Sequence, residues 1–88
     1  QAERRPAFVL SPGKYNAIVR LCILCPITKR AKGYPFEVAI PNGQRTTGVV
    51  LSDQVKSFDW FARNAEFAEN RPDVAAEVLA KLRAILSL

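Results

Sequence analysis

The hydrophobic residues of this 88-residue chain follow two different patterns. Over the first two-thirds, short apolar or alternating runs are separated by turn residues, which is typical of β-strands. From Pro72 onward the apolar residues recur every three or four positions, which predicts an amphipathic helix. Its apolar stripe consists of Val74, Val78, Leu82 and Ile85, flanked by Leu79 and Leu86. Pro72 suits the first helical position, and Asp73 favours the positive end of the helix dipole.

Two compact apolar runs predict the first two strands. Residues 7–10 form the first, and the sequence Ser-Pro-Gly at 11–13 ends it with turn chemistry. Residues 14–16 are a connector of at most one helical turn, and residues 18–25 form the second strand. Pro26 should end that strand, because proline has no N–H to donate to a ladder.

An alternating segment then predicts a hairpin. Phe36, Val38 and Ile40 alternate with Glu37 and Ala39, and residues 46–51 return after an Asn-Gly turn at 42–43. Residues 52–63 fit a short strand and an irregular turn, and residues 65–68 predict one more short strand. Residues 1–88 should therefore form a single mainly β domain, a small curled sheet or barrel of antiparallel strands capped by the C-terminal helix.

Positive charge is concentrated at one end of the sequence. The formal net charge is +5, and residues 1–65 carry ten Lys or Arg and four Asp or Glu, against three and four in residues 66–88. A basic face of this kind suits a polyanion such as nucleic acid or an acidic peptide, although solubility alone is an alternative. The longest apolar run, around residues 21–26, is strand-sized, so no membrane partner is expected.

Cysteine and histidine usage argues against metal or redox chemistry. Cys22 and Cys25 form a C-x-x-C motif, but there is no second pair and no His. A structural zinc site needs about four such ligands. Residues three apart in a strand point to opposite faces, so the two thiols should not meet. We expect two inert, reduced cysteines, no metal, no cofactor and a cytoplasmic location.

Four segments in order resemble one family along the whole chain. QAERRPAFVLSP at the start, then CPIT, KGYPFEV and VVLSDQVKSFDW, followed by the amphipathic helix, are similar to the MazF/PemK toxins of bacterial toxin–antitoxin systems. The resemblance implies an SH3-like barrel of the MazF/PemK/CcdB type and a homodimer. It also implies a ribosome-independent endoribonuclease, or mRNA interferase, that cuts single-stranded RNA at short sequences. The implied partner is a MazE-like antitoxin with an acidic, disordered tail, with which such toxins bind DNA.

This sequence departs from the family pattern in two places. Family members usually begin with another strand and a flexible loop, whereas this sequence starts after that loop. We therefore expect an N-terminally incomplete domain, in which the strand at 7–10 lies beside an open edge or another polypeptide. Some members also carry a His before the Arg-Pro pair, where this chain has Arg4.

RNA cleavage by its own 2′-OH needs a base, stabilisation of the phosphorane charge and protonation of the leaving oxygen, but no metal. The resemblance places the catalytic arginine at Arg5 and the catalytic threonine at Thr28. Asp53 is a third candidate, either as the base or to orient Arg5. The alternative is a purely structural role, in which Asp53 closes the strand end with an Asx-turn. Glu3 is a weaker option. Taken without the resemblance, Arg5 is an exposed residue at a strand start and Thr28 a turn-capping hydroxyl.

Substrate binding is expected on the basic loop that follows Thr28. Phosphate contacts are assigned to Lys29, Arg30 and Lys32, close backbone approach to Gly33, and neighbouring contacts to Lys56 and Ser57. Tyr34 or Trp60 could stack on an unpaired base, while Phe36 and Phe58 should be core residues. Two other functions stay open: a non-catalytic module that binds RNA or the antitoxin, and a gyrase-directed toxin of the same fold. The Arg5 and Thr28 pair favours the nuclease, because a gyrase binder needs no phosphate-directed arginine beside a hydroxyl.

Overall fold

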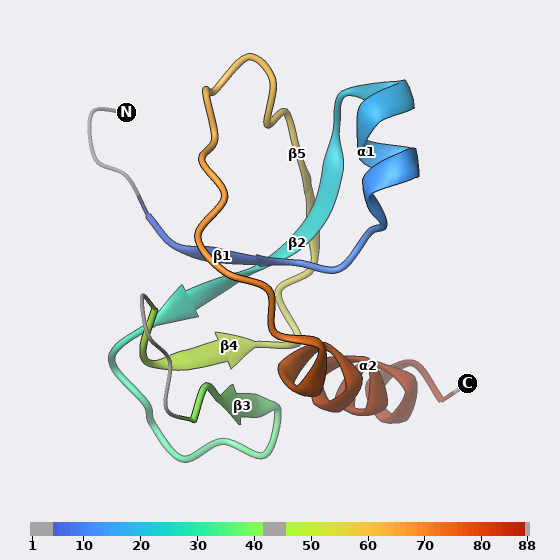
Figure 1. Ribbon diagram of the computed structural model, residues 1–88. Helices are drawn as coiled ribbons and strands as arrows, with labels where there is room; N and C mark the ends of the chain where they lie inside the picture. The colour runs from blue at the N-terminus through green and yellow to red at the C-terminus, as the bar shows by residue number, and fades with distance from the viewer. Residues whose placement is uncertain (1–4, 42–45, 88) are drawn as a thin grey trace.

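Strand β2, Cys22–Thr28, is the strand around which the sheet is built in the computed structural model, which describes residues 5–41 and 46–87 (Figure 1). Strand β1, Ala7–Val9, pairs with it antiparallel, with Ala7 opposite Pro26 and Val9 opposite Leu24. On its other side β2 pairs with two strands in succession. Its first half pairs with β5, Lys56–Phe58, and its last residues pair with β4, Val49–Leu51.

Strands β3, Glu37–Ala39, and β4 form the predicted hairpin, with Val38 opposite Val50. Hydrogen bonds extend it at both ends, from Ser52 N–H to Phe36 O and from Ile40 N–H to Gly48 O. The predicted Asn-Gly turn at 42–43 lies outside the described residues. The resulting strand order is β1-β2-β4-β3, with β5 also on β2, so the five-stranded sheet is curled but not closed. Within the described residues β1 pairs only with β2, and its far side is an open edge, as expected.

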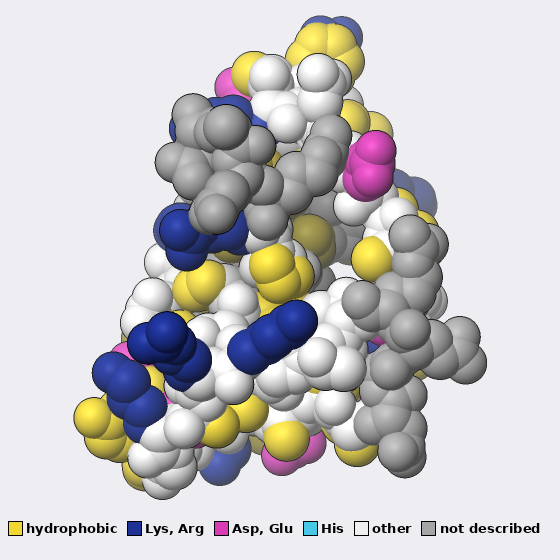
Figure 2. Space-filling model, turned by 90° about the vertical axis from the view of Figure 1, so that its left-hand side faces the viewer, with side chains coloured by type: hydrophobic (Ala, Val, Ile, Leu, Met, Phe, Trp, Pro, Cys, Tyr) yellow, Lys and Arg dark blue, Asp and Glu magenta, His cyan; other side chains and the backbone are white. Residues whose placement is uncertain are grey.

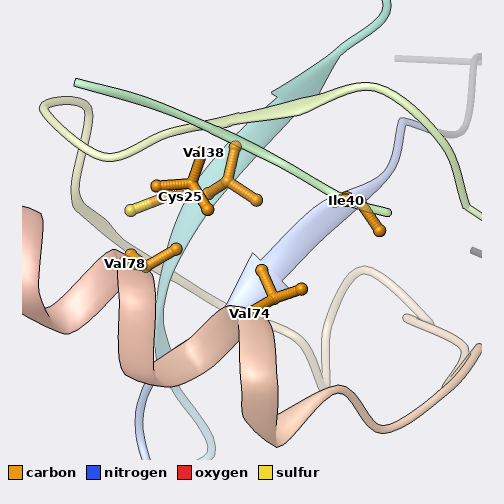
Figure 3. Packing of buried hydrophobic residues seen from close by; sticks show 6 residues of the cluster. Cys25, Val38, Ile40, Val74 and Val78 are labelled. Carbon is orange, nitrogen blue, oxygen red and sulfur yellow. The ribbon is translucent and has the colours of Figure 1, made fainter. Parts of the chain in front are cut away.

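Helix α2, Pro72–Leu86, covers one face of this sheet, as the periodicity predicted. Val74 and Val78 point from the helix toward Cys25 and Val38 of the sheet and toward Ile40, which follows β3 (Figure 3). Val50 completes the buried cluster, while Leu82 is half-buried and Ile85 is exposed. At the start of the helix Pro72 lies in the first turn and Arg71 forms a 3.0 Å ion pair with Asp73.

The structure corrects the prediction for residues 14–25. A two-turn helix, α1, spans Gly13–Val19, and β2 begins at Cys22 rather than at residue 18. The side chains of Ser11 and Asn16 hydrogen-bond to each other across the first turn, and Arg20 ends the helix with a φ of 61°. Ile18 is 81% exposed, so the apolar run that indicated a strand is not buried as one.

Pro26 does not end the strand as predicted. It lies inside β2, opposite Ala7, and the strand continues to Thr28. The N–H of the next residue, Ile27, points to β1 and donates to Pro6 O, so the nitrogen of Pro26 faces the other side of β2. There the pairing with β5 stops at Leu24 and that with β4 starts at Ile27. Pro26 therefore occupies the gap between two partner strands, where no ladder hydrogen bond is required of it.

The predicted strand at residues 65–68 is absent. These residues are irregular, and Phe67 is 78% exposed, so it contributes nothing to a buried sheet face. The short strand and turn predicted within residues 52–63 are confirmed by β5 and by the turn that follows it.

Two serines allow a matched test of the packing. Ser52 is fully buried, and its Oγ has no hydrogen-bond partner among the described residues. Ser52→Ala should therefore raise the free energy of unfolding by about 1 kcal/mol, because an unpaired buried hydroxyl is costly. Ser11 Oγ accepts the N–H of Ile23 at 2.9 Å, so Ser11→Ala should lower the free energy of unfolding by about 1 kcal/mol. Urea unfolding measures both; a loss of stability in Ser52→Ala would contradict the prediction.

Candidate functional site

The β1–β2 register brings Arg5 and Thr28 together. Ala7 lies opposite Pro26, and the bond from Ile27 N–H to Pro6 O shows that the register continues beyond the strand end. One residue further, Arg5 stands opposite Thr28. Directly opposed residues of an antiparallel pair project from the same face, with Cβ atoms about 5 Å apart. Two residues that are far apart in the sequence therefore present a guanidinium and a hydroxyl on one surface.

Thr28 is half-buried at the last position of β2, and its hydroxyl has a defined partner. Its Oγ1 accepts the N–H of Arg30 at 3.1 Å, which is the turn-capping role described above. A hydroxyl that accepts one hydrogen bond still has its own proton to donate. The turn thus orients the Thr28 hydroxyl and leaves it able to donate to an oxygen of a bound molecule.

The loop after Thr28 carries the predicted basic residues on the surface. Lys29, Arg30 and Lys32 are all exposed, and Lys and Arg side chains gather on the face of the molecule shown in Figure 2. Gly33 has a φ of 83°, in the left-handed region that favours glycine. Electrostatically this face suits an anion, which agrees with the charge distribution along the sequence.

An open depression of about 270 Å³ lies between this loop and the β3–β4 hairpin. Its walls combine a hydroxyl, two cations, a carboxylate, an amide and apolar groups, contributed by Thr28, Arg30, Lys32, Tyr34, Phe36, Glu37, Leu51 and Gln54. The rings of Tyr34 and Phe36 stack at 5.1 Å between centroids. Phe36, predicted as a core residue, is half-buried and lines this depression instead.

Sequence reasoning missed three residues that line the depression, namely Glu37, Leu51 and Gln54. Glu37 and Leu51 are cross-strand neighbours in the hairpin. The alternation of residues 36–40 places Glu37 on the face away from the core, which was a usable signal for Glu37. Leu51 and Gln54 gave no comparable signal, because their position depends on where β4 pairs with β2.

Asp53 lies on a different element from Thr28, next to Gln54, which lines the same depression as Thr28. Thr28 pairs with Val49 at the start of β4, whereas Asp53 lies in the turn after the end of that strand. That turn is closed by a bond from Gln54 N–H to Leu51 O. The role of Asp53 as base or orienting group stays a prediction.

The two residues assigned on β5 face different sides of the sheet. Lys56 stands opposite Leu24 of β2. Leu24 and Thr28 are four residues apart on this strand and therefore share a face, so Lys56 projects from the same face as Thr28. Ser57 stands opposite Ile23 and projects from the other face. Lys56, but not Ser57, thus shares a face of the sheet with Thr28.

Two aromatic residues away from the depression have other contacts. The Trp60 indole N–H donates to Asn16 O of α1 at 3.2 Å, so the structure uses Trp60 to hold α1. Phe58 is half-buried, with the Arg63 guanidinium 5.6 Å from its ring centroid. Of the two predicted stacking residues, only Tyr34 lies at the depression.

The C-x-x-C motif has the properties of packed core cysteines. Cys22 and Cys25 are both buried and neither forms a disulfide. Burial raises the pKa of both thiols, and the negative charge of Asp53 raises that of Cys25 further. A raised pKa disfavours the reactive thiolate, which supports the inert interpretation.

Residues 5–41 and 46–87 contain no group of three or more His, Cys, Asp or Glu side chains arranged to hold a metal ion. No helix in the same residues is long and apolar enough to cross a membrane.

The fold and this surface define a class of protein: a small antiparallel sheet with one covering helix and a basic, partly aromatic depression on its outer side. Residues 1–86 match the family described as PemK-like, MazF-like toxins of type II toxin–antitoxin systems. The chain belongs to this family, and the resemblance inferred from its sequence is confirmed.

Three relatives illustrate the match. The chain is 46% identical over 88 residues to the endoribonuclease toxin MazF of Escherichia coli strain K12, covering all of this chain and 76% of that protein. It is 35% identical over 92 residues to the endoribonuclease PemK of Escherichia coli, covering 99% of this chain and 69% of that protein. It superposes on a crystal structure of MazE–MazF (Form-I) from Deinococcus radiodurans with a TM-score of 0.90 and 52% identity, covering 97% of this chain and 84% of that one. The open, curled sheet is therefore of the SH3-like, MazF/CcdB type.

Gly48 holds the hairpin close to the candidate site. A Cβ at this position would lie 2.4 Å from the backbone oxygen of Thr28, and the φ of Gly48 is 120°. Gly48→Ala should lower the free energy of unfolding by at least about 2 kcal/mol, from backbone strain and displacement of β4 from Thr28.

Gly13→Ala is the matched control, because nothing lies within 4 Å of an added Cβ there and α1 begins at this residue. It should be neutral or stabilising by about 0.5 kcal/mol. Thermal and urea unfolding of both variants give the comparison. Equal stabilities for the two would contradict the close approach at Gly48.

Proposed function

We propose that this chain is the endoribonuclease toxin of a toxin–antitoxin system and cleaves single-stranded RNA at short sequences. The observation that carries the proposal is the register that sets Arg5 opposite Thr28, at the edge of a basic loop. Family membership supports the same activity, since the relatives above are named endoribonucleases. The function needs only an arrangement that stabilises phosphate charge and moves protons, without a metal step.

In the proposed reaction the RNA supplies its own nucleophile. The 2′-oxygen loses its proton to a base and attacks the adjacent phosphorus, and the bond from phosphorus to the 5′-oxygen breaks. The products are a 2′,3′-cyclic phosphate and a 5′-hydroxyl, whose oxygen takes up a proton. Charge builds on the non-bridging oxygens during this displacement.

Arg5 is assigned to that charge. Its guanidinium is a cation with a planar fork of donors, which can hold two phosphate oxygens at once. Thr28 is assigned to hydrogen bonding with a phosphate oxygen or the 2′-OH, because a hydroxyl is a poor base and the bond from Arg30 N–H already orients it. Asp53 is kept as a candidate base or orienting group; to act as the base, its carboxylate must come within hydrogen-bond reach of the 2′-OH in the RNA complex.

RNA binding is assigned to the basic loop and its surroundings. Lys29, Arg30, Lys32 and Lys56 supply phosphate contacts, Gly33 permits close approach of the backbone, and Ser57 is retained as a weaker candidate. Tyr34, which is 51% exposed and stacked on Phe36, is the candidate for stacking on an unpaired base.

The proposed partners follow from family membership. We propose a homodimer that is inhibited by a MazE-like antitoxin, because solved relatives include MazE–MazF complexes. An acidic antitoxin segment would compete with RNA for the same basic face, since both are polyanions. The proposed site of action is the cytoplasm, where such RNA is found.

Arg5→Ala should lower the rate of RNA cleavage about 100- to 1,000-fold, the range for loss of one charge-stabilising donor. Thr28→Val should cost about tenfold, because it keeps the shape and removes one hydrogen bond. Cleavage of a long single-stranded RNA in EDTA, with mapping of the new ends, measures both. Arg83→Ala, which removes the same charge from an exposed position on α2, is the control and should cleave at the parent rate.

The same assay separates the remaining assignments. New ends that carry 2′,3′-cyclic phosphates support the proposed reaction, whereas RNA that is bound but left intact by the parent protein supports the non-catalytic module. Asp53→Asn tests the base: a large fall in rate with unchanged RNA affinity assigns Asp53 to proton transfer. A parent rate in Arg5→Ala would refute the proposed site.

RNA affinity should fall steeply as salt is added. Four or five phosphate contacts predict a slope of about −3 in log affinity against log salt for a single strand. Arg30→Ala should make the slope shallower by about 0.7, and Arg83→Ala should leave it unchanged. Fluorescence anisotropy of a labelled oligouridine between 50 and 200 mM salt gives the slope. An affinity independent of salt would exclude the basic loop as the binding surface.

A further inference from the structure

Glu37 is the single acidic residue among the described residues that line the depression, where it lies with Arg30 and Lys32. A carboxylate there opposes the binding of a polyanion, because it repels the phosphates that the cations attract. The proposed function gives this residue no role.

The contacts of Glu37 are with the backbone of the basic loop. Its Oε2 accepts the N–H of Lys32 at 3.0 Å, and its Oε1 accepts the N–H of Gly33 at 3.0 Å and that of Lys32 at 3.3 Å. Its own backbone N–H donates to Tyr34 O at 3.1 Å. One residue on strand β3 thus fixes three successive positions of the loop.

The loop geometry explains why a carboxylate is used. The successive N–H groups of Lys32 and Gly33, with Gly33 at a φ of 83°, both point to one anion. Hydrogen bonds to a charged acceptor are stronger than those between neutral groups. Glu37 is itself held by the hairpin, where it pairs with Leu51, so the loop is tied to a fixed part of the sheet.

We propose that Glu37 is a positioning residue for RNA binding: it orders the backbone of residues 32–34, so that the second half of the basic loop is preset before RNA arrives. This inference rests on the proposed function. An unordered loop would lose conformational freedom on binding, and that loss is subtracted from the affinity. In this proposal, the affinity for RNA that is gained by ordering the loop exceeds the affinity that is lost through repulsion between Glu37 and the phosphates.

The test uses Glu37→Ala, with Glu77→Ala as the matched control. Glu77 is an exposed carboxylate on α2, so both variants raise the net charge by one. We expect Glu37→Ala to weaken binding of a labelled oligouridine and to raise KM for cleavage about tenfold, while kcat changes less than about threefold. Amide hydrogen exchange at Lys32 and Gly33 should accelerate at least about tenfold, because the acceptor of both N–H groups is gone. Glu77→Ala should neither weaken RNA binding, nor raise KM, nor accelerate exchange at Lys32 and Gly33.

The sign of the change in affinity decides between ordering and repulsion. If Glu37 only repels RNA, or occupies a site that a phosphate would fill, Glu37→Ala binds more tightly, and the proposal is overturned. Parent-like KM and exchange rates also overturn it.

Glu37→Gln keeps the inference testable if the alanine variant does not fold. The amide oxygen can still accept from Gly33, but the amide NH₂ faces the Lys32 N–H, so an intermediate loss of affinity is expected. A glutamine variant that binds RNA as tightly as the parent, or more tightly, contradicts the ordering role.

Failure of the proposed function gives a different result from failure of this inference. If the parent protein neither binds nor cuts RNA, the proposed function is wrong. The exchange rates at Lys32 and Gly33 still report whether Glu37 orders the loop. If the parent cuts RNA and Glu37→Ala matches it, the function stands and the positioning role is wrong.

Discussion

The pairing of β2 with three other strands is the interaction on which the rest of the structure depends. Its register with β1 sets Arg5 opposite Thr28, its register with β4 sets Val49 opposite Thr28, and its register with β5 sets Lys56 opposite Leu24. Because side chains alternate along β2, Cys25 and Ile27 project from its other face, toward the core that α2 covers. A slip of one residue in any of these pairings would exchange the two faces. The core and the candidate site are thus specified by the same backbone hydrogen bonds.

The core beneath this sheet is small and made largely of compact side chains. Val38, Val50, Val74 and Val78 are fully buried, and together with Cys25 they join α2 to the strands (Figure 3). Branched side chains with few rotamers lose little conformational entropy when they are packed. A domain of this size has a small free energy of unfolding. The buried hydroxyl of Ser52, unpaired among the described residues, and the close approach at Gly48 should therefore change that free energy measurably.

The loop between β2 and β3 combines three devices that act on one surface. Thr28 closes its first turn through the N–H of Arg30, Glu37 holds its middle, and Tyr34 stacks on Phe36 at its end. The loop therefore has defined backbone positions although most of its residues are exposed. Such an arrangement fixes the backbone from which Lys29, Arg30 and Lys32 project.

The sequence by itself determined the elements whose pattern is local. The alternation at residues 36–40, the 3.6-residue period after Pro72 and the excess of Lys and Arg before residue 65 predicted the hairpin, α2 and the basic face, and the motifs predicted the family. Residues 18–21 and Pro26 were wrongly assigned, because side-chain bonds between Ser11 and Asn16 favour a helix and because β2 changes partner at the proline. Only the tertiary structure decided that Arg5 stands opposite Thr28, that Ser57 projects from the other face of the sheet, that Trp60 contacts α1, and that Glu37 accepts hydrogen bonds from the loop. These facts depend on strand register and on contacts between distant residues, which no local pattern of hydrophobicity or charge encodes.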